Sequence, residues 1–153
     1  MQRELMWRKT LSRTDAQRQK GNQTGDLRLT QARFEYRGKR IDQTKYFRYE
    51  VFGDGEWSEP DRPPQGIKKP YTYREVSTFV FKIMIEGEKE RLMEMEVSHK
   101  KSGEAGQGNY TTGIRWGPVM VHKLRERVNI TGMVLSLYRL PEGDFELDIR
   151  YEK

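Results

Sequence analysis

The chain has no cysteine and few hydrophobic residues. Without cysteine among its 153 residues, it cannot form disulfides, use a thiolate as a nucleophile or hold a cysteine-ligated metal. Hydrophobic residues make up 34% of the chain, the same share as charged residues, and no run approaches the roughly 18–20 apolar residues of a membrane span. The N-terminal segment also lacks the apolar core of a signal peptide. We therefore expect a soluble, cytoplasmic protein with no membrane partner.

The known catalytic residue sets are incomplete as well. His99 and Lys101 supply the first half of a phospholipase-D-type nuclease motif, but the aspartate that this motif needs would fall at Gly106. No lysine has an acidic residue two positions before it, as metal-dependent restriction nucleases require. The glycine-rich stretch Gly103–Gly108 carries an acid where a phosphate loop would hold phosphate. We expect no enzyme activity, no metal ion and no cofactor.

Two other function classes stay open. His99, Asn109 and His122 occur in the order of a His-Asn-His nuclease, in which a base, an orienting amide and a metal ligand converge. Basic β-barrels can also bind RNA through aromatic side chains on the sheet face. Most aromatics here follow the alternation of a core, which disfavours RNA binding.

Positive charge is concentrated in two segments. The net charge is +6, which favours a polyanionic partner such as nucleic acid. Residues 1–48 carry 13 basic and 5 acidic side chains, and residues 98–127 carry 6 and 2. Between them, residues 49–97 carry 7 basic and 11 acidic side chains, and residues 128–153 carry 3 and 5. Two positive segments fit an anion-binding surface with two jaws.

Hydrophobic alternation at period two predicts an all-β fold. Leu5, Trp7 and Leu11 share one face of a strand by this pattern. The seven expected strands lie around 5–11, 27–29, 79–85, 93–97, 110–116, 133–140 and 145–151. The turn sequences Glu86–Glu88 and Pro141–Asp144 indicate hairpins, so much of the sheet should be antiparallel. Trp7 and Trp116 are interpreted as core residues.

Two segments have a helical pattern, and one is a long loop. Asp42–Phe52 and Pro118–Val128 are expected to be short helices, with Asp42 as the N-cap of the first. Gly53–Tyr73 holds four of the six prolines and is interpreted as an insertion without an assigned role. Two helices and seven strands predict a barrel or pseudobarrel, with residues 1–153 forming one domain.

Two polar segments are rich in residue types that recognise bases. These are Arg13–Asp26, here called the N-terminal arm, and Ser98–Gly113, here called the C-terminal arm. Arginine pairs with guanine, glutamine or asparagine pairs with adenine, and acidic side chains accept from cytosine, whereas lysine mainly contacts phosphate. The composition of both arms therefore favours base recognition.

The same segments carry a resemblance to a known family. Trp7–Ala16 followed by Gly25–Leu29 resembles the opening of the B3 DNA-binding fold of plant transcription factors. Gly21–Leu29, Ile41–Arg48 and Gly106–Gly117 are more similar to the C-terminal B3-like domain of NgoFVII-type restriction endonucleases. The resemblance covers nearly the whole chain.

The resemblance implies a seven-stranded B3-like open pseudobarrel that clamps double-stranded DNA by two arms in the major groove. It places these arms at Arg13–Asp26 and, slightly extended, at Ser98–Arg115. It also implies a bacterial restriction–modification system, in which a phospholipase-D-type nuclease domain of the parent chain makes the dimer and cuts DNA. The present chain would be the recognition domain, with a short specific DNA site as its partner.

Arm composition and resemblance together define the expected DNA contacts. The candidate base-reading residues are Arg13, Asp15, Gln17, Arg18, Gln19, Asn22, Gln23, His99, Glu104, Gln107, Asn109 and Tyr110. The candidate phosphate-binding residues are Lys9, Lys20, Thr24, Arg28, Arg33, Lys45, Lys100, Lys101, Thr112 and Arg115.

Overall fold

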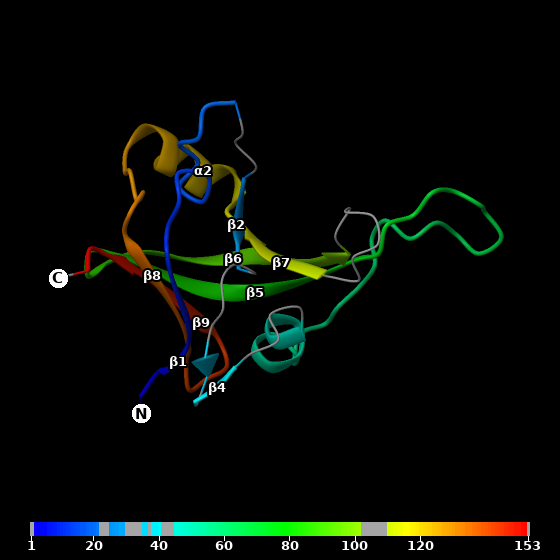
Figure 1. The fold of residues 1–153 in the computed structure, drawn as a ribbon, viewed down its shortest axis with the longest axis horizontal. Helices are drawn as coiled ribbons and strands as arrows, with labels where there is room; N and C mark the ends of the chain where they lie inside the picture. Colours follow the sequence, from blue (N-terminus) through cyan, green and yellow to red (C-terminus); the bar gives the residue numbers. More distant parts are fainter. Residues whose placement is uncertain are drawn as a thin grey trace.

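The computed structural model describes residues 2–21, 25–29, 35–36, 38–40, 45–101 and 110–152. Its main element is a curled, seven-stranded sheet (Figure 1), with the order β1-β8-β9-β5-β6-β7-β2. The strands are β1 (Glu4–Thr10), β2 (Asp26–Arg28), β5 (Arg74–Ile85), β6 (Glu88–Lys101), β7 (Tyr110–Arg115), β8 (Val134–Arg139) and β9 (Phe145–Arg150). These are the seven strands expected from the alternation, so the open pseudobarrel prediction is confirmed.

The central hairpin is longer than the sequence pattern indicates. β5 and β6 pair in antiparallel fashion from Arg74↔Lys100 to Ile85↔Glu88, and the turn between them is the predicted one. The predicted hairpin β8–β9 is also antiparallel. β9, however, pairs with β5 in parallel, which joins the two hairpins into one sheet.

Smaller elements complete the fold. A separate two-stranded hairpin, β3 (Glu35–Tyr36) and β4 (Lys39–Arg40), was not expected. The first predicted helix is a π-helix, η1 (Tyr46–Val51), and its expected N-cap Asp42 lies outside the described residues. The second is α2 (Gly117–Glu126), with a proline in its first turn as predicted. Neither helix in the described ranges has the length and apolar content that crossing a membrane requires.

The core lies inside the curl of the sheet, between the strands and the two helices. Trp7 and Trp116 are 1% and 0% exposed, which confirms them as core residues. The Trp7 ring meets Phe47 of η1 edge to face, with centroids 5.4 Å apart. Phe52, at the end of η1, lies 4.8 Å from Phe145 by the same measure. Through Phe47 and Phe52, η1 therefore packs against β1 and β9 and covers this part of the core.

The predicted inward face of β1 is wrong at Leu5, which is 40% exposed. Leu5 pairs with Tyr138 and Trp7 pairs with Leu137, so Met6 is an additional residue in a β-bulge. A bulge places two residues opposite one and shifts the alternation. Met6 and Trp7 are consequently both buried, and the Met6 carbonyl accepts a hydrogen bond from the Tyr46 hydroxyl at 2.6 Å.

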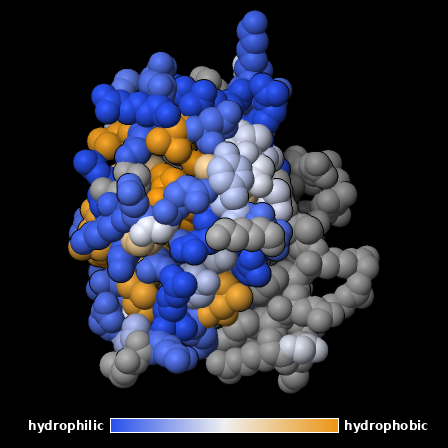
Figure 2. Space-filling model, turned by 90° about the vertical axis from the view of Figure 1, so that its left-hand side faces the viewer, coloured by the Kyte–Doolittle hydropathy of each residue, from blue (hydrophilic) through white to orange (hydrophobic). Residues whose placement is uncertain are grey.

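The surface outside the core is mainly hydrophilic. Figure 2 shows one face on which the hydrophobic side chains form small areas between hydrophilic ones. The exposed large hydrophobic residues include Leu92 on β6 and Val119 on α2. Tyr151, expected to continue the inward face of β9, is 60% exposed because the strand ends at Arg150.

Candidate nucleic-acid interface

We call residues 12–17, where the N-terminal arm leaves β1, the root of that arm. A polar groove of about 550 Å³ lies between this root and the outer face of β2, β7 and β6. Its lining residues are Ser12, Thr14, Asp15, Asp26, Arg28, Arg74, Glu96, Ser98, Lys100, Thr111, Gly113 and Arg115. Both arms begin at its border, because the N-terminal arm leads from β1 to β2 and the C-terminal arm runs from the end of β6 into β7. The groove is therefore the surface that the two arms flank.

Strand alternation explains which side chains form the floor of the groove. Arg28 on β2 pairs with Gly113 on β7, and Gly113 pairs with Ser98 on β6. Lys100 lies two residues beyond Ser98 and so points to the same face. Gly113 adds no side chain to this row, and a Cβ there would lie 3.2 Å from the Leu27 carbonyl oxygen. The centre of the floor is therefore low, with cationic side chains on both sides.

Each acidic side chain in the groove has a cationic neighbour. The Asp15 carboxylate lies 2.8 Å from the Lys9 ammonium, and Glu96 lies 3.1 Å from Arg74. Asp26 is 3.9 Å from Arg115. Burial raises the pKa of the Asp26 carboxyl, although Arg115 opposes that shift. Each of these acids is matched by a cation, which leaves further positive charge in the groove to be accounted for.

That further charge belongs to Arg28 and Lys100. Both residues are exposed and line the groove, and neither has an ion-pair partner among the residues that the structure describes. They sit on opposite sides of β7, at the root of one arm each. The groove is therefore able to accept an anion from solvent.

The root of the N-terminal arm is a buried hydrogen-bonded turn. Asp15 Oδ2 accepts hydrogen bonds from the Ser12 amide and hydroxyl, both at 3.0 Å. The Ser12 hydroxyl oxygen in turn accepts from the Asp15 amide at 3.1 Å. The Lys9 ammonium, which pairs with Asp15, also donates to the Arg28 carbonyl at 2.9 Å. The Lys9 side chain thereby joins the start of the arm to β1 and β2, the two edge strands at opposite ends of the sheet order.

Gln17 connects the two ends of the arm. Its Oε1 accepts the Gly25 amide at 2.7 Å, and its Nε2 donates to the Thr14 carbonyl at 3.0 Å. Gln17 has a φ of 60°, an uncommon backbone conformation for a residue other than glycine. The Trp116 indole N–H donates to the Asp15 carbonyl at 2.9 Å. The arm is thus attached to the core at its root.

These contacts correct several predicted roles in the N-terminal arm. Asp15 and Gln17 are 2% and 0% exposed, so their side chains hold the arm together and do not face a base. The Lys9 side chain is only 8% exposed and pairs with Asp15, so it is not a phosphate ligand. Arg18 is half-buried, and its Nε donates to the Leu124 carbonyl of α2 at 2.6 Å.

The exposed part of the N-terminal arm is smaller than its composition indicates. Arg13, Gln19 and Lys20 are exposed to solvent and keep their predicted roles as hypotheses. Three further predicted contacts, Asn22, Gln23 and Thr24, lie outside the described residues.

His99, Tyr110 and Thr112 of the C-terminal arm lie on the inner face of the sheet, away from the groove. His99 is 3% exposed, and its ring stacks on Tyr110 with centroids 4.9 Å apart. Its Nδ1 lies 3.0 Å from the hydroxyl of the fully buried Thr112. Burial lowers the pKa of His99 to about 4, so the ring is neutral at pH 7. The predicted DNA contacts of His99 and Thr112 are therefore wrong, whereas Tyr110 is half-buried and keeps its predicted role as a hypothesis.

The remaining predicted contacts divide into three groups. Arg28, Lys100 and Arg115 line the groove, and Lys101 is exposed at the end of β6. Lys45 is exposed but precedes η1 and does not line the groove. The predicted contacts that lie outside the described residues in the rest of the chain are Arg33, Glu104, Gln107 and Asn109.

The groove also contains residues that the sequence did not single out, among them Arg74, Ser98 and Thr111. Arg74 pairs directly with Lys100 across the hairpin. The expected strand began only at Phe79, so this pairing was not available from the alternation. Counting back from the turn at Gly87 would have placed Arg74 opposite His99, because a register shift between Ile83 and Met84 moves the pairing by one residue.

The two histidines do not form a nuclease centre. His122 is exposed on α2 beside a cavity of about 230 Å³ that Arg91 also lines. Arg91 and His99 are eight residues apart on β6, which corresponds to roughly 26 Å along a strand. Asn109 lies outside the described residues. The described ranges contain no group of three or more potential metal ligands. Among the described residues that line the groove, none is aromatic, so the groove offers no ring on which an RNA base could stack.

The fold is thus an open β pseudobarrel with a polar groove between the roots of two arms. No protein-family model matches the chain, and no curated protein or solved structure is significantly similar to it.

Proposed function

We propose that this chain binds double-stranded DNA at a specific short sequence, with the groove facing the DNA and the two arms entering the major groove. The observation that carries the proposal is the pair Arg28 and Lys100, which lie without ion-pair partners among the described residues at the roots of the two arms. Phosphate contacts of this kind position a protein on DNA, and side chains on the arms then read base edges.

The spacing of these two cations supports the proposal. Arg28 and Ser98 are separated by two strand spacings, and Lys100 lies two residues further along β6. Strand geometry then puts the Arg28 and Lys100 backbones roughly 12 Å apart. This is close to the ~12 Å width of the major groove. The two side chains could therefore contact phosphates on opposite sides of that groove.

The resemblance to B3-like domains of restriction endonucleases supports a more specific role. In that role the chain is the target-recognition domain, and a nuclease domain of the same parent protein cuts DNA and forms the dimer. The incomplete catalytic sets and the separation of the two histidines support binding without cleavage.

Selection from a randomised duplex pool tests sequence-specific binding, and the recovered duplex then serves as the probe. We expect Arg28→Ala/Lys100→Ala to weaken binding to both the selected and a random duplex, because phosphate contacts form on any sequence. The slope of log K against log salt should become shallower by about 1.8, at ~0.9 for each contact.

The matched control is Lys89→Ala/Arg91→Ala, which removes the same charge at the far end of the β5–β6 hairpin. Both residues are exposed, and their loss should leave the slope unchanged. Equal effects of both double variants would refute the groove as the interface. Supercoiled plasmid incubated with the chain and Mg²⁺ should remain intact, and nicking that disappears in His122→Ala would contradict the absence of catalysis.

A further inference from the structure

The loop Gly53–Tyr73, here called the side loop, leaves the sheet directly beside the C-terminal arm. Arg74 at the start of β5 pairs with Lys100 near the end of β6. The Lys101 amide donates to the Tyr73 carbonyl at 2.9 Å, and the Tyr73 and Tyr110 rings pack edge to face with centroids 5.7 Å apart. The side loop therefore projects from the same end of the hairpin as the arm (Figure 1).

Acidic side chains are held in the part of the side loop nearest the sheet, residues 59–61 and 71–73, here called its neck. Glu59 accepts a hydrogen bond from the Tyr71 hydroxyl at 2.5 Å and another from Arg62 at 3.0 Å. Asp61 pairs at 2.8 Å with Arg74, which itself lines the groove. The Glu59–Tyr71 hydrogen bond thereby joins the two sides of the neck. The Asp61–Arg74 ion pair joins the neck to the groove.

The tip of the side loop is a turn followed by two lysines. The Ile67 amide donates to the Pro64 carbonyl at 3.1 Å, and Gly66 has the positive φ of 91° that a type II turn requires at its third position. Lys68 and Lys69 follow the turn. Both are exposed, and in the described part of the chain neither has an ion-pair partner.

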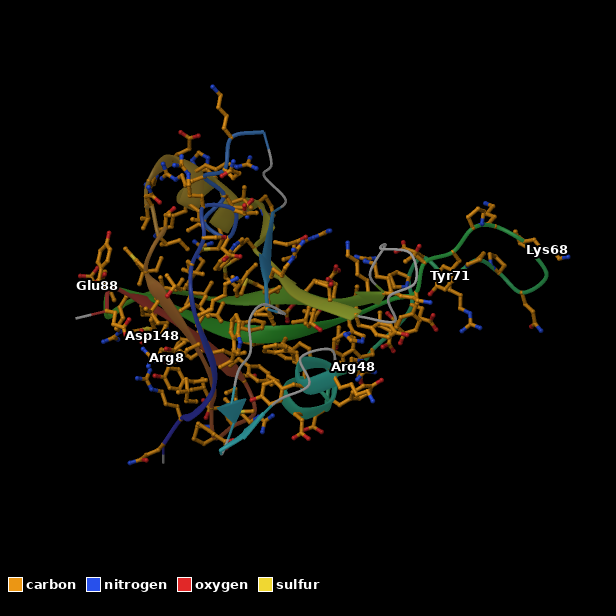
Figure 3. All side chains as sticks on the ribbon, viewed as in Figure 1. Arg8, Arg48, Lys68, Tyr71, Glu88 and Asp148 are labelled. Atoms are coloured by element: carbon orange, nitrogen blue, oxygen red, sulfur yellow. The ribbon has the colours of Figure 1, made fainter. Side chains whose placement is uncertain are left out.

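Beyond its neck, the side loop is rich in proline and carries charge of one sign. Residues 62–70 contain three basic residues, three prolines and no acidic residue. Proline restricts the backbone and reduces the entropy lost when a loop is ordered on binding. Figure 3 shows Lys68 at the far end of the molecule, with Tyr71 nearer the neck. The tip therefore exposes two lysines that can bind an anionic surface beyond the groove.

We infer that the side loop is a third DNA contact, in which Lys68 and Lys69 bind backbone phosphates outside the segment that the two arms read. The inference rests on the proposed function, because duplex DNA in the groove would continue past the C-terminal arm toward the side loop. The loop would add affinity without sequence information, since a phosphate contact is made on any sequence.

Salt titrations of duplex binding test this inference. The probe is a random-sequence duplex of about 30 base pairs, close to three helical turns, with binding followed by fluorescence anisotropy. For Lys68→Ala/Lys69→Ala we expect the slope of log K against log salt to be shallower than in the unmodified chain by about 1.8. The thermal unfolding midpoint should not change, because both side chains are exposed outside the core.

The control is again Lys89→Ala/Arg91→Ala, which changes the net charge equally at the opposite end of the hairpin. Lys89 follows Glu88, which Figure 3 labels far from Lys68. An unchanged slope for the side-loop variant, with an unchanged slope for the control, would overturn the inference and leave the proposed function intact. An equal decrease in both variants would also overturn the inference, and it would count against the groove as the interface. If the unmodified chain shows no salt-dependent duplex binding, the proposed function fails and the inference fails with it.

Discussion

Replacement of His99 by glutamine should remove a defined part of the pH dependence of folding. His99 lies between Tyr110 and Tyr49, with ring centroids 4.9 and 6.5 Å away. Burial lowers its pKa from 6.5 to about 4, Glu75 opposes that shift, and Arg48 reinforces it. The unfolded chain therefore binds a proton at His99 before the folded chain does, so stability is complete above pH 6.5 and decreases as the pH falls toward 4.

The size of the effect follows from the two pKa values. Each unit of pKa difference corresponds to about 1.4 kcal/mol. Between about pH 7.5 and about pH 5 the lower pKa should cost the unmodified chain about 2 kcal/mol of unfolding free energy. Glu75 does not interfere in this range. Its burial alone would raise its pKa, but hydrogen bonds from Arg48 and Tyr73 hold that pKa below its ordinary value of 4.5, so its contribution is lost only at lower pH.

Urea unfolding at both pH values measures this difference. In His99→Gln the loss between the two pH values should be smaller by about 2 kcal/mol, because glutamine does not titrate and can still hydrogen-bond to Thr112. His122→Gln is the control for loss of an imidazole, since His122 is exposed on α2, away from His99. The same pH dependence in His99→Gln as in the unmodified chain would refute the assignment.

Three further predictions concern the arm root, a close contact and the arm tip. Asp15→Ala should lower the unfolding free energy by about 3–5 kcal/mol, because it removes the carboxylate partner of the buried Lys9; a loss below about 1 kcal/mol in urea unfolding would place this pair among surface ion pairs. Gly55→Ala should cost about 1–3 kcal/mol, because its Cβ would lie 2.3 Å from the Phe79 ring, and an unchanged thermal midpoint would contradict this. Lys20→Ala should weaken specific and random duplex binding equally and reduce the salt slope by about 0.9; a loss confined to the specific duplex would make Lys20 a base contact.

Local patterns were sufficient to predict the strands and much of the core. Alternation located all seven strands of the sheet, because a half-buried strand must place every second side chain on the core side. The turn at Glu86–Gly87 and the burial of Trp7 and Trp116 follow from the same local signals. The lengths of β5 and β6 do not, since their outer portions are paired but only partly buried and carry little hydrophobic signal.

The candidate site shows where sequence reasoning reached its limit. The composition of the arms made Asp15, Gln17 and His99 resemble exposed base readers, because a loop has no periodicity that separates buried from exposed positions. Only the tertiary structure decides that Asp15 meets Lys9 and that Gln17 joins the two ends of its arm. Those partners lie on other strands or across a loop, so their proximity depends on long-range strand pairing that no local pattern encodes.

The sequence by itself determined that the chain is basic, lacks cysteine and forms an all-β fold with two polar arms. The tertiary structure decided the parallel pairing of β9 with β5, the bulge at Met6, and the gathering of Arg28 and Lys100 in one groove. Charge and alternation are properties of neighbouring residues and can be read along the chain. The position of one strand beside another depends on the packing of the whole sheet, and that is why the groove appears only in three dimensions.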